Sequence, residues 1–309
     1  MPACQAVETE SAAPTLVAPA PFDDPDGDLI LRTADGVDFR VHRAVLQLSS
    51  SFFATMISLP QPPSQVDGDK FQPADNVVFM SDDSKVLYRL LSWADPRGAL
   101  ELRDLQDAAE ILTCAEKYGM LMVKRRMMEF GYGGRESLKE NPIALFALAR
   151  RFEHPEMADF AAEESLRIAV VDWPNSTLLD LITARDYQAL VRYYFYCQRA
   201  AKSVLKDWVQ WSGTRDYVWK ATWSLHNCTF KNYEGTNYPE WWVHYLEAIG
   251  RALWETPSPR VVLLIDIISV TAPACLCGKC RPKYVSDVQS FNDLLVKRLD
   301  ETAAKVIVP

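Results

Sequence analysis

A group of cysteines near the C-terminal end has the residue types and the spacing for metal chemistry. Cys277 and Cys280 form a C-x-x-C pair, and Cys275 lies two positions before it. Two intervening residues allow both sulfurs of such a pair to face one ion. Upstream, His226 and Cys228 add one nitrogen ligand and one sulfur ligand. Four of these five side chains would complete a tetrahedral site for zinc as a structural cofactor.

Two other states of these cysteines remain open. The chain has seven cysteines, an odd number without a signal peptide, which favours free thiols or metal ligands over a disulfide framework. Ordinary reduced thiols are an alternative to zinc, because one C-x-x-C pair is weaker evidence than two. A redox dithiol is the third possibility, although this pair does not follow a thioredoxin-like strand. Gly278, inside the pair, favours the turn that zinc binding needs.

Known catalytic patterns are incomplete elsewhere in the sequence. The glycine-rich run 131–134 lacks the preceding strand and the following Lys-Ser/Thr of a phosphate-binding loop. A thiol nucleophile at Cys114 or Cys197 would need a histidine from a distant part of the chain, and no family signature surrounds either residue. The sequence therefore predicts a protein that is not an enzyme, with a thiol-dependent enzyme as the remote alternative.

The composition predicts a globular protein and argues against several partner classes. At 309 residues and 49% hydrophobic, the chain is long enough for two domains. A net charge of -8 opposes direct binding of nucleic acid, which depends on clustered basic residues. The apolar run 261–270 is about half as long as a membrane span. The first ten residues lack the basic start of a secretory signal, so we expect a cytoplasmic or nuclear protein without membrane contact.

The first third of the chain alternates between strand and helix patterns. Residues 1–27 mix alanine and proline and show no period, which predicts a disordered tail. Leu29–Thr33 and Val37–Val41 flank an Asp-Gly turn and predict a hairpin. From residue 42, apolar residues recur at intervals of three and four, which predicts two short helices. The remaining expected elements are a strand over Val77–Met80, a helix capped by Ser81 or Asp82, and a helix that ends near Tyr118.

Several segments fit this order of elements: Asp28–Leu31, Phe39–Leu46 and Ala108–Leu112, together with Ser50, Phe53 and Tyr118. They resemble the BTB/POZ family over residues 28–130. The resemblance implies an α+β fold of short strands and helices whose role is protein–protein interaction. It does not by itself specify the partner.

The rest of the chain is predicted to be mainly α-helical. Asn141 and Pro142 have the residue types expected at an N-cap and in the first turn of a helix. The segments Asn141–Phe152 and Tyr187–Cys197 resemble the helical extension of fungal BTB/POZ proteins. We therefore assign residues 131–210 to such an extension.

Residues 211–309 form a region rich in tryptophan and cysteine. Seven of the nine tryptophans fall between Trp208 and Trp254. Their spacing of three or four residues predicts a core where helices cross rather than an aromatic recognition groove. The apolar run Val261–Val270 is expected to be strand-like.

The resemblance also suggests partner-binding residues in the first domain. Asp28 and Arg43 match the acidic and basic positions that line a charged groove in transcriptional BTB/POZ proteins. A charged pair that orients the hairpin against the first helix is the alternative. Leu100 and Glu101 match part of the motif of cullin-type adaptors, a large hydrophobe, any residue and then Glu, but Ala99 stands where the hydrophobe is required.

Two functions of different class follow from the resemblance. The first is a substrate adaptor of a cullin ubiquitin ligase, and the second is a transcriptional regulator or scaffold that recruits partners through the BTB groove. Dimeric transcriptional members carry a helix and an exchanged strand before the position of Asp28. Four prolines at that place in this chain disfavour a helix, so we predict no strand-exchanged homodimer.

Overall fold

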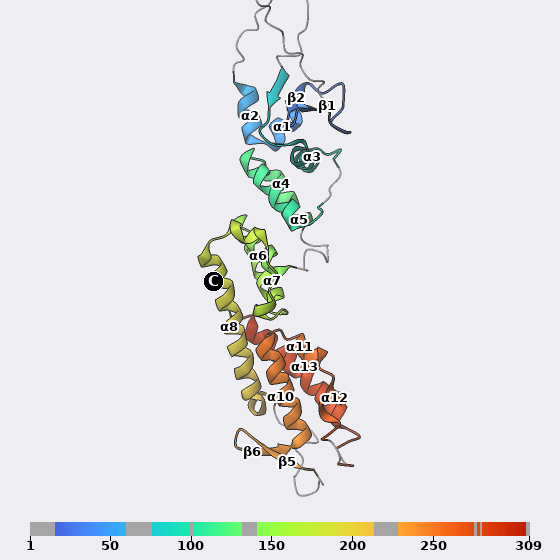
Figure 1. Cartoon of the computed structure of the whole chain (residues 1–309), viewed down its shortest axis with the longest axis vertical. Helices are drawn as coiled ribbons and strands as arrows, with labels where there is room; N and C mark the ends of the chain where they lie inside the picture. Colours follow the sequence, from blue (N-terminus) through green and yellow to red (C-terminus); the bar gives the residue numbers. More distant parts are fainter. Residues whose placement is uncertain are drawn as a thin grey trace, which may run out of the picture. The chain divides into compact units, whose positions relative to one another are not determined.

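The computed structural model describes residues 16–59, 76–98, 102–131, 141–212, 228–274, 277–278 and 280–306. The chain divides into two compact units, residues 1–136 and residues 137–309. Figure 1 labels most elements of both units. Within the described ranges, no helix combines the length and the apolar character needed to cross a membrane.

A four-stranded sheet with the order β1-β3-β2-β4 organises the first unit. The predicted hairpin is confirmed: β2 (Leu29–Arg32) and β3 (Val37–Val41) are antiparallel, and Gly36 takes a positive φ of 80° in the turn between them. The strands β1 (Leu16–Val17) and β4 (Val77–Phe79) pair in parallel with β3 and β2, respectively.

The described part of the first unit contains five helices, and their apolar faces bury Phe53, Leu87 and Leu112 completely. The predicted cap of the third helix is wrong by one residue, because the side chain of Asp83 accepts the hydrogen bond from the N–H of Val86. Asp82 instead accepts hydrogen bonds from Lys117 and Tyr118. The helices are α1 (Arg43–Ser49), α2 (Ser51–Ser58), α3 (Ser84–Ala94), α4 (Leu105–Lys117) and α5 (Leu121–Gly131).

The prediction of a disordered tail is wrong for residues 16–27, which form an ordered strap on the first unit. The side chain of Phe22 is 1% exposed and packs against the rings of Phe39 and Tyr88. The backbone carbonyl of Phe22 accepts a 2.8 Å hydrogen bond from the N–H of Arg40. Prolines disfavour a helix but allow an extended segment. Burial of a single aromatic side chain can hold such a segment in place, and this leaves no periodic pattern in the sequence.

In its described residues, the second unit is helical apart from one hairpin, as the sequence predicts for the region after residue 130. Asn141 caps its first helix by accepting a hydrogen bond from the N–H of Ala144. The elements are α6 (Pro142–Arg151), α7 (Pro155–Ser165), the short 3-10 helices η3 (Val170–Asp172) and η4 (Thr177–Leu181), α8 (Ala184–Lys206), α9 (Trp208–Trp211), β5 (Phe230–Tyr233), β6 (Thr236–Pro239), α10 (Glu240–Glu255), α11 (Val261–Leu264), α12 (Ile267–Thr271) and α13 (Tyr284–Ala303).

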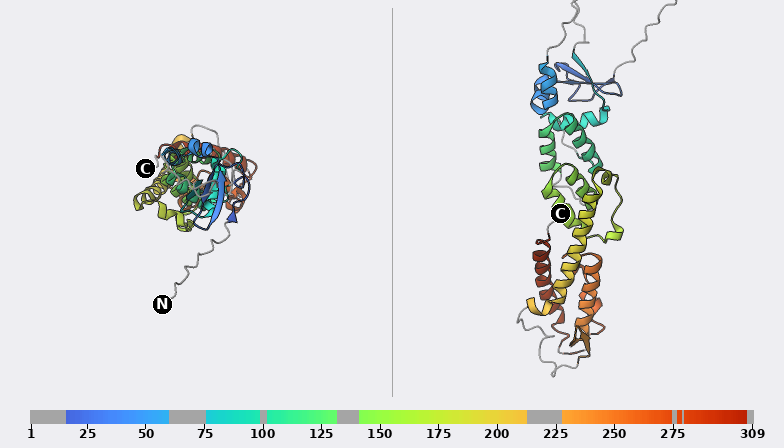
Figure 2. Two further views of the ribbon diagram at one scale, coloured as in Figure 1. Left: turned by 90° about the horizontal axis from the view of Figure 1, so that it is seen from above. Right: turned by 90° about the vertical axis from the view of Figure 1, so that its left-hand side faces the viewer.

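An aromatic core joins α8, α10 and α13, which pack together (Figure 2). Trp208 and Trp242 are buried in this core, as their spacing predicts, and the adjacent Trp241 is buried as well. Trp254 is not, because its side chain is 56% exposed. Two further tryptophans of the predicted group, Trp219 and Trp223, lie outside the described residues.

The expected strand over Val261–Val270 is wrong, because this run forms the helices α11 and α12. Asp266 separates them and caps α12 by accepting hydrogen bonds from the N–H groups of Ile268 and Ser269. A short apolar run has no period that distinguishes a strand from a buried helix. The Asp266 cap therefore favours a helix over a strand in this run.

Candidate functional site

The predicted pair of Asp28 and Arg43 is present at the start of the BTB-like unit. The Asp28 carboxylate accepts a 2.7 Å hydrogen bond from the backbone N–H of Arg43, the first residue of α1. The Arg43 guanidinium donates to the backbone carbonyl of Asp28 and to the side-chain oxygen of Asn76. A carboxylate at a helix N-terminus satisfies a backbone donor that has no partner within the helix. These hydrogen bonds give Asp28 and Arg43 a structural role at the start of α1. Their role in partner binding stays a prediction.

An apolar groove on the first unit lies between α2 and the turn from α4 to α5. Phe52, Met56 and Leu59 line one side of it, and Glu116 and Lys117 line the other. Phe52 is 46% exposed and Leu59 is 58% exposed. The sequence did not predict this groove, because apolar residues at intervals of three and four indicate a helix but not which of them stay exposed.

The adaptor-type residues Leu100 and Glu101 lie outside the described residues. The chain resumes at Leu102, which is 3% exposed, and α4 begins at Leu105. Their proposed contact with a cullin therefore rests on the sequence alone.

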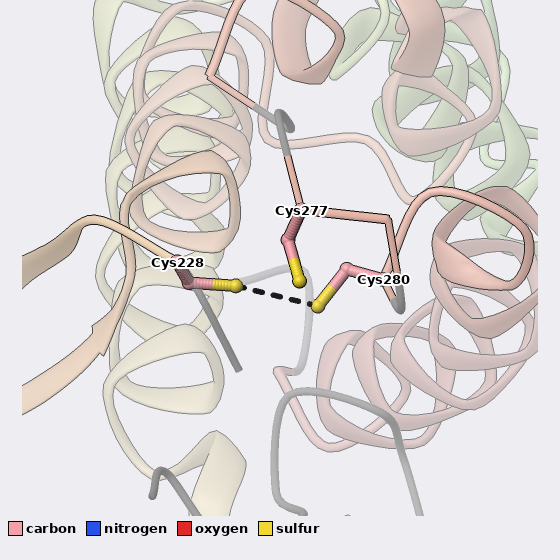
Figure 3. A group of neighbouring side chains, drawn as sticks. All are labelled: Cys228, Cys277 and Cys280. Atoms are coloured by element: carbon pink, nitrogen blue, oxygen red, sulfur yellow. Dashed lines mark hydrogen bonds between the residues drawn. The ribbon is translucent and has the colours of Figure 1, made fainter. Parts of the chain in front are cut away.

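Three of the five predicted metal ligands converge in the second unit, where the sulfurs of Cys228, Cys277 and Cys280 point toward one another (Figure 3). All three sulfurs lie within 4.8 Å of one another, and those of Cys228 and Cys280 are 3.4 Å apart. Cys277 is 4% exposed, and Cys280 is fully buried. The other two candidates, His226 and Cys275, lie outside the described residues.

Local structure explains how the C-x-x-C pair presents its sulfurs. The N–H of Arg281 donates to the carbonyl of Cys277, and the N–H of Tyr284 donates to the carbonyl of Cys280, so the pair forms a turn that leads into α13. Gly278 does not take a positive φ there, and open space surrounds the position of its missing Cβ. The turn therefore does not require glycine, contrary to the argument from sequence.

The environment of Cys228 and Cys280 keeps their thiols neutral when no cation is bound. Burial is the largest cause that raises the pKa of Cys280 and of Cys228 above that of a free cysteine. A divalent cation among the sulfurs reverses this effect, because a coordinated thiol is deprotonated. The arrangement can thus bind a soft cation with release of protons.

The two thiols considered as nucleophiles have environments that oppose that role. Burial raises the pKa of Cys114 to about 12 and that of Cys197 to about 11. A cysteine nucleophile acts as the thiolate, which requires a lowered pKa. Both residues are buried in the cores of their units, so they fit packing better than catalysis.

The family comparison agrees with the fold of the first unit. The sequence model of the BTB/POZ domain family matches residues 26–130. No curated protein matches the chain. The match ends at residue 130, so the resemblance of the second unit to the extension of fungal members stays a prediction. The hairpin, the paired helices and this match together identify residues 26–130 as a BTB/POZ domain, a protein-interaction domain that is followed here by a helical region.

Proposed function

We propose that this chain is a recruitment adaptor that binds a scaffold protein through the groove between α2 and α4. The main support for this proposal is the exposed apolar lining of the groove, in a domain whose role is protein interaction. Exposed apolar side chains that gather at one place, with polar residues at the rim, are typical of protein-binding surfaces. Thr55 lies one turn before Leu59 and lines the same groove.

Within this function, we propose a cullin ubiquitin ligase as the scaffold. The helical unit follows the BTB/POZ domain in the chain, at the place where the family resemblance puts a second adaptor contact. Leu100 and Glu101 supply part of the expected motif. No catalytic group is needed for this role, because the ligase provides the chemistry and the adaptor provides proximity.

A transcriptional or scaffolding role is the second candidate. It would use the Asp28 and Arg43 region, which lies at the surface of the domain with Asp28 exposed. The strand β1 pairs with β3 within the chain. That no strand is exchanged with a second copy stays a prediction from the prolines before Asp28. A recruiting role of this class would place the protein in the nucleus, whereas the adaptor role is compatible with the cytoplasm.

A pull-down of cullin scaffold proteins with the full-length chain tests the proposal. The double substitution Thr55→Glu and Leu59→Glu adds two negative charges to the groove, and we expect it to reduce cullin capture at least tenfold. Leu48→Glu is the matched control, since Leu48 is 86% exposed on α1 of the same unit and does not line the groove. Equal capture by wild type and the double variant would reject the groove. Nuclear localisation with capture of corepressor-type proteins instead of cullins would favour the second candidate.

A further inference from the structure

The spacing of the three cysteine sulfurs in the second unit matches a metal coordination sphere. Around a tetrahedral zinc with Zn–S bonds of about 2.3 Å, neighbouring sulfurs are separated by about 3.8 Å. The observed separations, 3.4 Å for Cys228 and Cys280 and at most 4.8 Å for any pair, bracket this value. Small side-chain rotations are therefore enough to place one ion at bonding distance from all three.

The origin of the ligands is also typical of a structural site. Cys228 lies two residues before β5, whereas Cys277 and Cys280 lie in the turn before α13. The sulfurs thus come from segments that are 52 residues apart in the sequence. Closing a loop of this length is entropically costly for the free chain, and an ion that binds only the folded arrangement stabilises it.

The surroundings explain why three thiols gather there. Cys277 and Cys280 belong to the buried cluster that contains Trp241 and Tyr284, and Cys228 packs against it. A single disulfide bond would join only two of these sulfurs, and the third would lie next to it without taking part. One ion uses all three.

We propose that Cys228, Cys277 and Cys280 bind a structural zinc ion as thiolates. Zinc fits better than calcium or magnesium because sulfur ligands favour soft or borderline cations over hard ones. The ion joins the β5–β6 hairpin to the start of α13. The site is independent of the groove on the BTB/POZ domain, so either proposal can fail without the other.

Metal analysis of the purified full-length protein is the direct test. We expect one zinc per chain, and X-ray absorption at the zinc edge should show at least three sulfur ligands at about 2.3 Å. The double variant Cys277→Ser and Cys280→Ser should lose the metal, whereas Cys114→Ser, in the first unit, should retain it. A protein that holds no zinc, and binds none when zinc is added to the reduced form, contradicts the proposal.

Thiol alkylation followed by mass spectrometry covers the case in which the double variant fails to fold. In the native wild-type protein, Cys228, Cys277 and Cys280 should resist alkylation until a strong chelator is added. The chelator should release zinc and expose the three thiols together. Alkylation at the same rate with and without chelator would show ordinary thiols, and a mass lower by two hydrogens would show a disulfide; either result overturns the proposal.

Discussion

The two units differ in how their aromatic side chains are arranged. Among the described residues of the first unit, the rings form two separate groups, one around Phe22 and one around Phe53. In the second unit, a small group forms around Trp173 and Tyr194. A larger connected group includes Trp208, Trp242 and Phe291 and spans α9, α10 and α13. A small ring group holds one segment against its neighbour, whereas the connected group holds several helices together. The second unit should therefore respond more strongly to the loss of a single ring.

The substitution with the largest expected effect is Trp242→Ala. Trp242 is fully buried, and its ring lies 5.3 Å from that of Trp208 and 4.9 Å from that of Phe291. We expect a loss of about 4 to 5 kcal/mol of unfolding free energy, since the substitution removes apolar contacts and leaves a cavity. Denaturant titration followed by tryptophan fluorescence measures this loss.

Trp254→Ala is the control for that substitution, because Trp254 lies on the same helix but is 56% exposed. It should cost less than about 1 kcal/mol. Hydrogen exchange should show faster exchange across α8, α10 and α13 in Trp242→Ala and unchanged exchange in α1–α4. Similar losses for both variants would contradict the idea of a connected core.

Phe22→Ala tests the smaller aromatic group in the first unit. We expect a loss of about 3 kcal/mol, because this ring is buried but anchors only the strap of residues 16–27. The strap should then exchange rapidly and become sensitive to protease, while the β2–β3 hairpin stays protected. Val17→Ala is the control, since Val17 lies in the same strap and is 54% exposed. A strap that remains protected in Phe22→Ala would show that Phe22 is not its anchor.

The regularity of the first unit explains why most of it could be predicted. Its hairpin combines an Asp-Gly turn with an alternating returning strand over Val37–Val41, and both are local signals. The strap could not be predicted, because it depends on one distant contact between Phe22 and the sheet. The β5–β6 hairpin of the second unit could not be predicted either. Glu234 and Gly235 take positive φ values of 48° and 85° in its turn, and glutamate is not a residue type that indicates such a turn.

The candidate sites show the same division between local and distant information. The C-x-x-C spacing indicated a group of sulfurs, and Cys228 was added from its residue type; the structure brings all three together. The groove was missed because Phe52 and Phe53 are adjacent and equally apolar, yet only Phe53 is buried. Which of two neighbouring rings faces the core depends on the position of the helix on the sheet, and composition does not contain this information.

The pH dependence of the first unit should depend on Asp95, at the end of α3. Its carboxylate accepts hydrogen bonds from the backbone and the guanidinium of Arg97, which also binds Asp24 in the strap. Burial raises the pKa of Asp95, but the hydrogen bonds from Arg97 outweigh burial and lower it overall. A carboxyl whose pKa is lower in the folded state stabilises the protein above its unfolded pKa of about 3.9, and this contribution is lost as the pH falls through the folded pKa.

Asp95→Asn should therefore cost about 2 kcal/mol at pH 7, because it removes a charge-assisted network. The difference from wild type should shrink as the pH is lowered below about 4, where wild-type Asp95 also becomes protonated. Thermal unfolding of both proteins across this pH range provides the measurement. Asp23→Asn is the control, because Asp23 lies in the same strap at an exposed position, and it should leave the unfolding free energy nearly unchanged. A constant difference at all pH values would mean that the charge of Asp95 is not the cause.

The smallest expected effect concerns the start of α8, the long helix that contributes to the aromatic core of the second unit. The hydroxyl of Thr183 accepts a hydrogen bond from the N–H of Asp186, and the Asp186 carboxylate accepts one from the N–H of Thr183. Removing such a cap costs about 1 kcal/mol. Thr183→Ala should therefore lower the unfolding free energy of the second unit by that amount, whereas Thr183→Ser keeps the hydroxyl and most of the stability. Since Asp186 also binds Arg150 of α6, a larger loss in denaturant titration would mean that the cap positions this ion pair as well.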